Sequence, residues 1–319
     1  MKDNFGRELS YLRLSVTDRC NLRCQYCMPE AGIEKQPHDS VLRNEEYIKL
    51  VKAMADLGVT KVRFTGGEPL VRKGLPELIG EIKQIDGIKE VTLTTNGILL
   101  KPHLAALKKA GVNRLNISLD SLEPDTYRQL TRGGELSEVL SGIEEAIKLG
   151  FSPIKINVVL IKGINDHEID RMIHYFDPMV EVRFIELMPI GEAASWSKDK
   201  FIDLSHLFLT REGYEAESND GKSGPCRYFR QTTTGRRVGI INSISEHFCA
   251  SCNRLRVTSD GMLKTCLHDT SEVNLRTVLT DEVMLKQTIL GAVGLKPESH
   301  HLGSENHLPI SRNMYTIGG

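Results

Sequence analysis

The 319-residue sequence lacks any apolar run that approaches the length of a transmembrane helix. Its first twenty residues carry polar and charged side chains throughout, without the apolar core of a secretory signal. Internal repeats and low-complexity tracts are absent as well. We therefore expect a soluble, cytoplasmic protein that has no contact with a membrane.

An excess of charge of either sign is also lacking, because 41 Lys and Arg residues balance 42 Asp and Glu residues. The net charge of −1 gives no global field that would attract nucleic acid, so an anion-binding site would have to be built locally. Hydrophobic residues make up 40% of the chain. At this length, that is enough to bury the core of one large α/β domain with a smaller appendage.

The seven cysteines do not suit a disulfide framework, because their number is odd and six of them fall into two groups of three. Cys20, Cys24 and Cys27 form the first group, and Cys226 belongs to neither. A fourth Cys or His is missing near the first group, since His38 is the closest candidate and follows a proline. Structural zinc normally takes four ligands, whereas three thiolates on a four-iron cube leave one iron open for chemistry. The spacing favours such a [4Fe–4S] cluster over zinc or over three buried free thiols.

The second group pairs a CxxC motif, Cys249 and Cys252, with Cys266 after thirteen intervening residues. His268 could complete a zinc site of three cysteines and one histidine. The spacing alone therefore leaves zinc and an iron–sulfur cluster both open.

Six β-rich segments alternate with helical segments over the first 190 residues. Several helical segments end at a glycine that is followed directly by a strand, as at Gly58, Gly111 and Gly150. This alternation predicts a parallel sheet with right-handed crossovers. A complete eight-fold barrel typically needs ~250 residues, so we expect an α/β fold with an open, partial (β/α)6 TIM-like barrel. The strands are expected at about 9–16, 59–65, 88–95, 112–118, 151–161 and 181–188, and helices at about 44–57, 101–110, 138–149 and 166–176.

The character of the chain changes after about residue 191. A loop, a helical stretch around 201–208 and a polar linker at 217–224 are followed by short strands at 236–243 and 254–267. We therefore expect two domains, a barrel over 1–217 and a smaller β-rich C-terminal domain over 218–319.

Polar and glycine-containing sequences follow the expected strands. Barrel enzymes place their catalytic groups on loops at the C-terminal ends of the strands. The first strand runs into the first cysteine group, so the ends of the other strands should share its face. The sequences at those ends are Gly66-Gly67-Glu68-Pro69, Thr94-Thr95-Asn96-Gly97, Ser118-Leu119-Asp120 and Met188-Pro189.

The first cysteine group has the pattern CxxxCxxC, with the aromatic Tyr26 directly before the third cysteine. This pattern resembles the signature of the radical S-adenosylmethionine (SAM) superfamily. The resemblance implies that the open iron chelates the amino and carboxylate groups of SAM. Electron transfer would then cleave SAM to a 5′-deoxyadenosyl radical.

The second cysteine group and the final Gly318-Gly319 extend the resemblance over nearly the whole chain, from about Tyr11 onwards. Together they resemble the GTP 3′,8-cyclase family, the molybdenum cofactor biosynthesis protein A family. This implies a second [4Fe–4S] cluster whose open iron contacts the guanine of GTP. It also implies a lyase that converts GTP to 3′,8-cyclo-7,8-dihydro-GTP in the first step of molybdenum cofactor biosynthesis.

The same resemblance assigns roles to individual residues. The SAM-binding residues that it implies are Tyr26, Gly67, Ser118, Met188 and, less directly, Asp120. Glycine at position 67 would let the backbone come close to SAM. For Met188, core packing at a strand end remains equally open.

Phosphate recognition favours arginine, and GTP carries a triphosphate. Arg254 and Arg256 alternate along one expected strand and therefore point to the same face. Each basic residue alone could be a solvated surface charge, but a charge that faces the inside of a barrel needs a partner. The GTP-binding residues implied by the resemblance are Arg13, Arg63, Thr94, Lys155, Arg254 and Arg256.

The C-terminal segment carries two further expectations. Gly318 and Gly319 could be a frayed terminus, but the resemblance implies a tail that enters the active site and is needed for catalysis. His300, His301 and His307 lie in a polar segment and are interpreted as surface residues.

Partners and rival functions follow from the same residues. The resemblance implies GTP as substrate, an external electron donor of the flavodoxin or ferredoxin type, and cyclic pyranopterin monophosphate synthase as the next enzyme; a homodimer is expected from base rates. One rival function is a radical SAM enzyme that acts on a peptide or another substrate. The other is a non-catalytic, zinc-stabilised binding module. About eight irons per chain would fit two clusters, whereas stoichiometric zinc without iron would fit the module.

Overall fold

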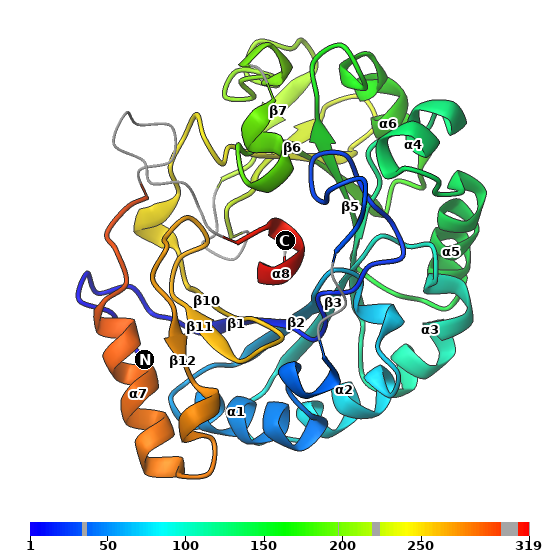
Figure 1. Cartoon of the computed structure of the whole chain (residues 1–319). Helices are drawn as coiled ribbons and strands as arrows, with labels where there is room; N and C mark the ends of the chain where they lie inside the picture. The colour runs from blue at the N-terminus through cyan, green and yellow to red at the C-terminus, as the bar shows by residue number, and fades with distance from the viewer. Residues whose placement is uncertain (34–36, 197, 219–223, 301–311, 319) are drawn as a thin grey trace.

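One continuous sheet of twelve strands organises the part of the chain that the computed structural model describes, which is all residues except 34–36, 197, 219–223, 301–311 and 319. The strand order is β12-β11-β10-β1-β2-β3-β4-β5-β6-β9-β8-β7. The eight strands from β10 to β9 in this order are parallel to one another. Figure 1 shows the sheet curved into a ring, with α1 to α6 on its outside and the short C-terminal helix α8 inside it.

The six strands predicted for the barrel are confirmed, each within a few residues of its expected bounds. They follow one another in the sheet in chain order, as successive right-handed βαβ units require. These strands are β1 (Tyr11–Ser15), β2 (Lys61–Thr65), β3 (Glu90–Thr95), β4 (Arg114–Ser118), β5 (Ile154–Leu160) and β6 (Val180–Glu186).

Four helices match the predictions, whereas the other helices were not predicted individually. The confirmed ones are α1 (Asn44–Asp56), α3 (Leu100–Lys109), α5 (Leu136–Lys148) and α6 (Ile169–Tyr175). The others are α2 (Leu75–Lys83), α4 (Pro124–Thr131), α7 (Glu282–Gly294) and α8 (Met314–Ile317). The short 3₁₀ helices are η1 (His38–Ser40), η2 (Pro69–Val71), η3 (Asp166–Glu168), η4 (Gly191–Ser195), η5 (Lys198–Lys200), η6 (Cys249–Ser251) and η7 (Arg276–Val278).

The helical stretch expected around 201–208 is wrong, because this segment forms turns. Asp203 accepts a hydrogen bond from the backbone nitrogen of Ser205 at 2.8 Å, and Glu186 accepts one from Leu204 at 3.1 Å. Such side-chain acceptors offer the backbone an alternative to helical hydrogen bonds. Phe208 nevertheless packs in the core against Phe184, which explains the apolar spacing that suggested a helix.

The strands after residue 210 extend the barrel sheet at both of its edges. β9 pairs in parallel with β6, and β10 pairs in parallel with β1. The strands expected near 236–243 and 254–267 are therefore confirmed, but they continue the barrel sheet, which the sequence did not predict. The division into domains at 217/218 stays a prediction. These strands are β7 (Tyr214–Ala216), β8 (Arg227–Gln231), β9 (Arg237–Ile241), β10 (Arg254–Val257), β11 (Met262–Lys264) and β12 (Val273–Asn274).

The two faces of the ring differ sharply in polarity. Apolar residues at alternate strand positions, such as Leu12, Val62 and Leu115, are fully buried in one core that also includes residues of the outer helices. The positions between them point into the ring, because successive side chains of a strand face opposite sides. The interior of an ordinary barrel is filled by branched apolar side chains, whereas these inward positions are mostly polar. The ring is therefore built to hold something other than its own core.

Among the described residues, no helix combines the length and the apolar character needed to cross a membrane.

Candidate functional site

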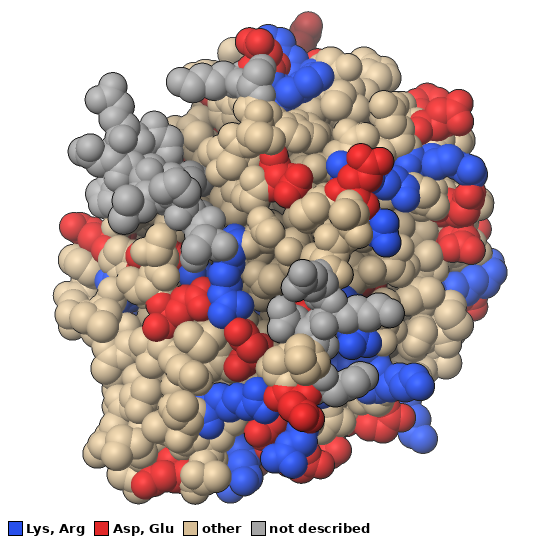
Figure 2. Space-filling view, in the orientation of Figure 1, with Lys and Arg blue, Asp and Glu red and all other residues tan. Residues whose placement is uncertain are grey.

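The inside of the ring is strongly cationic although the chain as a whole is neutral. The inward positions of the eight parallel strands carry nine basic side chains against two carboxylates, Glu90 and Glu181. On the face seen in Figure 2, by contrast, acidic and basic side chains of the described residues are interspersed. A polyanionic ligand would match this interior. The nine are Arg13, Lys61, Arg63, Arg114, Lys155, Arg183, Arg237, Arg254 and Arg256.

Three arginines predicted to bind GTP lie side by side across the sheet. Arg13 on β1 is in register with Arg256 on β10 and with Arg63 on β2. Burial lowers the pKa of Arg63 and of Arg256 to about 10, and it lowers the pKa of Arg13 well below its usual value. Guanidinium groups keep their proton in proteins, so an anion between these three would relieve their mutual repulsion.

Buried polar atoms without partners line the adjacent wall of the ring. In the described part of the chain, Thr94 Oγ1 and Asn116 Nδ2 have no hydrogen-bond partner, and neither has Arg183 Nε. Thr94 is in register with Asn116, and Arg183 donates to Asn116 Oδ1 at 3.0 Å. Buried polar groups are normally satisfied, so these atoms indicate the position of a polar ligand.

Lys155, also predicted to bind GTP, is already engaged. Its ammonium group forms an ion pair with Glu181 and donates to Tyr228 Oη at 2.6 Å. Arg237 stacks on the Tyr228 ring and donates to Glu181 Oε1 at 3.0 Å. The role of Lys155 as a GTP ligand stays a prediction, and GTP binding by Lys155 would require rearrangement of this network.

Arg254, the remaining basic residue predicted to bind GTP, is half-buried, and its guanidinium group lies 5.2 Å from the Phe248 ring centroid.

The first cysteine group lies on the loop that follows β1. Cys27 donates its backbone N–H to Cys24 O at 2.9 Å, which forms a tight turn between these two cysteines. Burial, with a contribution from the neighbouring thiols, raises the pKa of Cys24 well above its usual value and that of Cys27 to about 12. Burial also raises the pKa of Cys20 to about 11. A half-buried group of thiols that repel one another as anions fits a cationic metal centre, whose binding would release protons.

Gly67 holds this loop through close backbone contact. Its N–H donates to Thr17 O at 2.8 Å, and the neighbouring Glu68 N–H donates to Arg19 O at 2.8 Å. A Cβ atom at position 67 would lie 2.4 Å from Arg19 O and 2.6 Å from Asp18 O. Glycine is therefore required at position 67 by the cysteine loop itself. Its predicted contact with SAM stays a prediction.

Glu68 links the cysteine loop to the end of β3. Its carboxylate accepts hydrogen bonds from Thr95 Oγ1 at 2.7 Å and from the Asn96 and Leu70 backbone nitrogens at 2.7 and 3.1 Å. Asn96 in turn places its side-chain nitrogen 3.7 Å from Cys20 Sγ. Burial raises the pKa of Glu68 to about 7 despite these donors. The buried carboxyl therefore fixes the geometry around Cys20.

This burial predicts a pH-dependent difference in stability between the parent protein and a Glu68→Gln variant, both without clusters. The folded pKa of Glu68, about 7, lies above the ordinary value of 4.5, so the folded state binds the proton of this carboxyl more tightly than the unfolded state does. The stability that the protonated carboxyl contributes is therefore fully present below pH 4.5 and is lost as the pH rises to about 7. The free energy of unfolding of the parent should fall relative to the variant by about 3 kcal/mol across this window. Urea unfolding at a series of pH values measures it, and parallel pH profiles would contradict the burial argument.

The residues predicted to contact SAM gather at the same end of the strands. Tyr26 Oη donates to Asp120 Oδ2 at 2.6 Å, which ties the cysteine loop to the segment after β4. Asp120 also accepts the Val159 N–H at 2.8 Å, and burial raises its pKa to about 6. Ser118 ends β4, and Met188 follows β6; both are half-buried. Their contacts with SAM stay predictions.

The second cysteine group lies where the chain returns to the ring. Cys249 begins η6, Cys252 precedes β10, and Cys266 follows β11. The buried ammonium group of Lys296 lies 3.7 Å from Cys252 Sγ. Burial raises the pKa of Cys252, but Lys296 and Arg254 outweigh this effect, so the net pKa is lowered. A stabilised thiolate is what a metal ligand requires.

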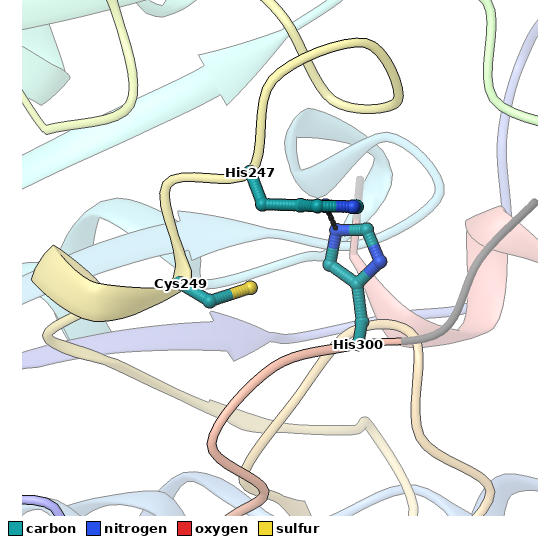
Figure 3. A group of neighbouring side chains, drawn as sticks. All are labelled: His247, Cys249 and His300. Carbon is teal, nitrogen blue, oxygen red and sulfur yellow. Dashed lines mark hydrogen bonds between the residues drawn. The ribbon is translucent and has the colours of Figure 1, made fainter.

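The interpretation of His300 as a surface residue is wrong. Only 6% of it is exposed, because its ring lies between His247 and His268, at centroid distances of 4.3 and 4.2 Å. Figure 3 shows that Cys249 points towards the rings of His247 and His300. His301 and His307 lie outside the described residues.

The C-terminal residues lie inside the ring, in agreement with the predicted tail. Ile317 is fully buried, and Gly318 O accepts a hydrogen bond from Arg256 at 2.6 Å. Gly318 has a φ of +79°, and a Cβ atom there would lie 2.5 Å from Thr65 Cγ2. Both features require glycine. Gly319 lies outside the described residues, and a catalytic role for either glycine stays a prediction.

Arg312 anchors this tail to the turn between β10 and β11. Its guanidinium group is ion-paired with Asp260 at 2.8 Å and with Glu272 at 2.7 Å. We expect Arg312→Ala to release the tail, so that the amides of residues 312–318 exchange hydrogen about tenfold faster. Hydrogen–deuterium exchange measures this. Arg211→Ala, which removes a distant ion pair with Asp170, is the control, and equal exchange in both variants would show that the anchor is dispensable.

Several residues of the site were missed in the sequence. Arg183 alternates into the ring as Arg63 does, and the same argument could have found it. Lys296 and Arg312 stand in no sequence motif that would predict a role in the site. Each contacts a segment far away in the chain, Lys296 at Cys252 and Arg312 at Asp260.

Comparison with known proteins extends these observations over the whole chain. The Radical SAM superfamily model matches residues 14–176, and the Molybdenum Cofactor Synthesis C model matches residues 180–302. A protein named GTP 3′,8-cyclase from Alkaliphilus oremlandii is 51% identical, with 100% of each chain covered. One of the same name from Alkaliphilus metalliredigens is 50% identical over 100% of each chain.

The fold also resembles that of solved structures. Streptococcus suis SuiB bound to S-adenosylmethionine matches with a TM-score of 0.57 at 16% identity, over 87% of this chain and 63% of that one. At this identity the similarity concerns the fold alone, and it agrees with a radical SAM barrel. With full-length relatives at half identity and a Radical SAM superfamily match over residues 14–176, the chain belongs to the GTP 3′,8-cyclase family of the radical SAM superfamily.

Proposed function

We propose that this protein is a lyase that converts GTP to 3′,8-cyclo-7,8-dihydro-GTP, the first step of molybdenum cofactor biosynthesis. The cationic interior of the ring supports this proposal most directly. Arg256, Arg13 and Arg63 form a row on β10, β1 and β2, and the two cysteine groups flank these strands. A triphosphate is the ligand that would neutralise such a row.

Each cysteine group has the donor set for one [4Fe–4S] cluster. Cys20, Cys24 and Cys27 would hold the first cluster, and Cys249, Cys252 and Cys266 would hold the second. When bound and reduced, the first cluster would supply the electron for reductive cleavage of SAM, the radical chemistry by which the C3′ hydrogen of GTP would be removed and a C3′–C8 bond formed.

The protein's own residues orient the reactants. The arginine row would bind the phosphates, while Thr94 and Asn116 offer unpartnered polar atoms to the rest of the nucleotide. The Tyr26–Asp120 hydrogen bond fixes the loop that would carry SAM. The tail that contains Gly318 lies inside the ring and would exclude molecules that quench a radical. Holding C3′ of GTP near C5′ of SAM is the main contribution expected of this site.

Finer features of this function are part of the proposal. Reduction requires an external donor of the flavodoxin or ferredoxin type, and cyclic pyranopterin monophosphate synthase would consume the product. We also propose a cytoplasmic location and a homodimer. The proposed function includes neither a membrane nor a nucleic acid as a partner.

The decisive experiment is anaerobic incubation of the iron-reconstituted protein with SAM, GTP and dithionite. We expect about eight irons per chain and formation of 5′-deoxyadenosine that depends on GTP, with ATP as the matched control. Arg63→Met should raise the GTP concentration needed for half-maximal turnover, whereas Arg230→Met, at an exposed position of β8, should not. Equal 5′-deoxyadenosine formation without GTP, or with a peptide in its place, would contradict the proposal.

A further inference from the structure

Three potential metal ligands converge next to the second cysteine group. They are His247 in the loop after β9, Cys249 at the start of η6, and His300 some fifty residues later in the chain. Their ligand atoms all lie within 4.8 Å of one another. Figure 3 shows the two rings in contact through a hydrogen bond between His247 Nδ1 and His300 Nε2, which measures 3.0 Å, with the Cys249 sulfur beside them.

These distances suit a single ion. With Zn–N bonds of 2.0–2.1 Å, two imidazole nitrogens on a tetrahedral zinc are about 3.3 Å apart. The nitrogens of His247 and His300 would therefore have to separate by only a few tenths of an ångström, replacing their hydrogen bond by two bonds to the metal. The ligands of a four-iron cube, in contrast, bind different irons and lie further apart.

We propose that His247, Cys249 and His300 form a mononuclear binding site for a divalent cation of the zinc class. Two imidazoles and one thiolate are a ligand set that zinc prefers, and three protein ligands leave a fourth position for water. The site shares Cys249 with the second cysteine group, so it is occupied only while the second cluster is absent. The competition between the ion and the second cluster for Cys249 rests on the proposed function, whereas binding of the ion to the cluster-free protein does not.

The surroundings decide on which side of Cys249 the ion sits. Lys296 and Arg254 lie on the side of Cys252, where their positive charges oppose a dication. On the other side, His247 is exposed and lines a cleft of about 480 Å³ together with Glu246 and Asn242. The ion can reach His247 through this cleft, which Arg227 also lines.

Packing shows that the site is held in place before an ion binds. The His268 ring covers His300 on one side. Arg7 donates to Cys249 O at 2.9 Å and to Glu298 O at 2.8 Å, so one guanidinium group ties the segment of Cys249 to the segment of His300. A site assembled from two such segments would keep the cluster-free protein ordered at this position.

The test uses Co²⁺ as a spectroscopic probe of the full-length, iron-free protein under reducing, anaerobic conditions. We expect one equivalent of Co²⁺ that depends on His247 to bind with a thiolate-to-cobalt charge-transfer band, in addition to Co²⁺ held by the first cysteine group, and Zn²⁺ to displace it. His247→Ala and His300→Ala should each weaken Co²⁺ binding tenfold or more, whereas His206→Ala, at an exposed position elsewhere, should not. His247 is exposed, so its variant tests the site even if His300→Ala does not fold.

Reconstitution tests the exclusivity. Protein loaded first with Zn²⁺ should take up iron for one cluster, about four irons, and the His247→Ala variant treated in the same way should take up about eight. Cobalt binding without the thiolate band, or with equal affinity in the histidine variants, would overturn the proposal. Loss of iron from His300→Ala with unchanged cobalt affinity would overturn it as well, because His300 would then be a ligand of the cluster. Turnover of GTP by fully iron-loaded protein reports on the proposed function independently of these outcomes.

Discussion

Gly67→Ala is expected to remove the first cluster from the protein. The added methyl group would lie 2.4 Å from Arg19 O and 2.6 Å from Asp18 O, and both are backbone atoms that cannot turn aside. The cysteine loop, which begins at Cys20 directly after Arg19, must then move. This movement should lower the stability of the folded protein by on the order of 3–5 kcal/mol. Iron analysis after reconstitution should fall from about eight to about four irons per chain, and SAM cleavage should be lost.

Gly80→Ala provides the matched control for this substitution. Gly80 lies in α2, and a Cβ atom there would meet nothing within 4 Å. Alanine also favours a helix over glycine by about 1 kcal/mol, so this variant should be as stable as the parent or more so. Full iron content and activity in Gly67→Ala would show that the loop tolerates the shift and that the close contact has no role in holding the cluster.

Arg256→Met is expected to weaken GTP binding about 100-fold while both clusters remain, because it removes a buried charge but none of the cysteines that would hold a cluster. Arg256 is 5% exposed and is the residue that joins the cationic row to Gly318 of the tail. Methionine keeps much of the buried volume but neither the charge nor the hydrogen bonds. Equilibrium binding of GTP to the reconstituted protein in the absence of SAM measures the effect.

Two controls separate the role of the charge from the role of the tail. Arg230→Met removes an exposed arginine of β8 and should leave GTP binding unchanged. Deletion of residues 318–319 removes the tail contact but keeps the arginine, so it should affect turnover more than binding. Parent-like GTP affinity in Arg256→Met would remove Arg256 from the substrate site.

The barrel strands could be predicted because their signals are local. Gly58, Gly111 and Gly150 each end a helix just before a strand, and the apolar alternation of the strands marks which face is outward. The pairing of β9 with β6 and of β10 with β1 could not be predicted, because register between distant segments leaves no periodic pattern. The helix predicted at 201–208 was wrong for a related reason. The apolar spacing of this segment reflects packing of Phe208 against the core, which depends on residues far away in the chain.

In the candidate site, too, residues with a local sequence signal could be predicted, whereas contacts between distant segments could not. The cysteines and the alternating arginines carry their chemistry in their own spacing, so Cys20 and Arg256 could be proposed as site residues from the sequence, and their roles stay predictions. His300 was misassigned because its burial depends on rings contributed by His247 and His268, which are distant in the chain. Lys155 was assigned correctly to the interior, but its ion pair with Glu181 became visible only in three dimensions.

The way in which the last third of the chain joins the sheet bears on aggregation. β10 covers the edge of β1, and β9 covers the edge of β6. A fragment that ended at residue 217 would expose both edges as rows of unpaired backbone groups, and such edges recruit strands from other molecules. The barrel segment should therefore be prone to aggregation when it is produced alone, and the C-terminal segment acts as an intramolecular edge cover as well as the carrier of the second cysteine group.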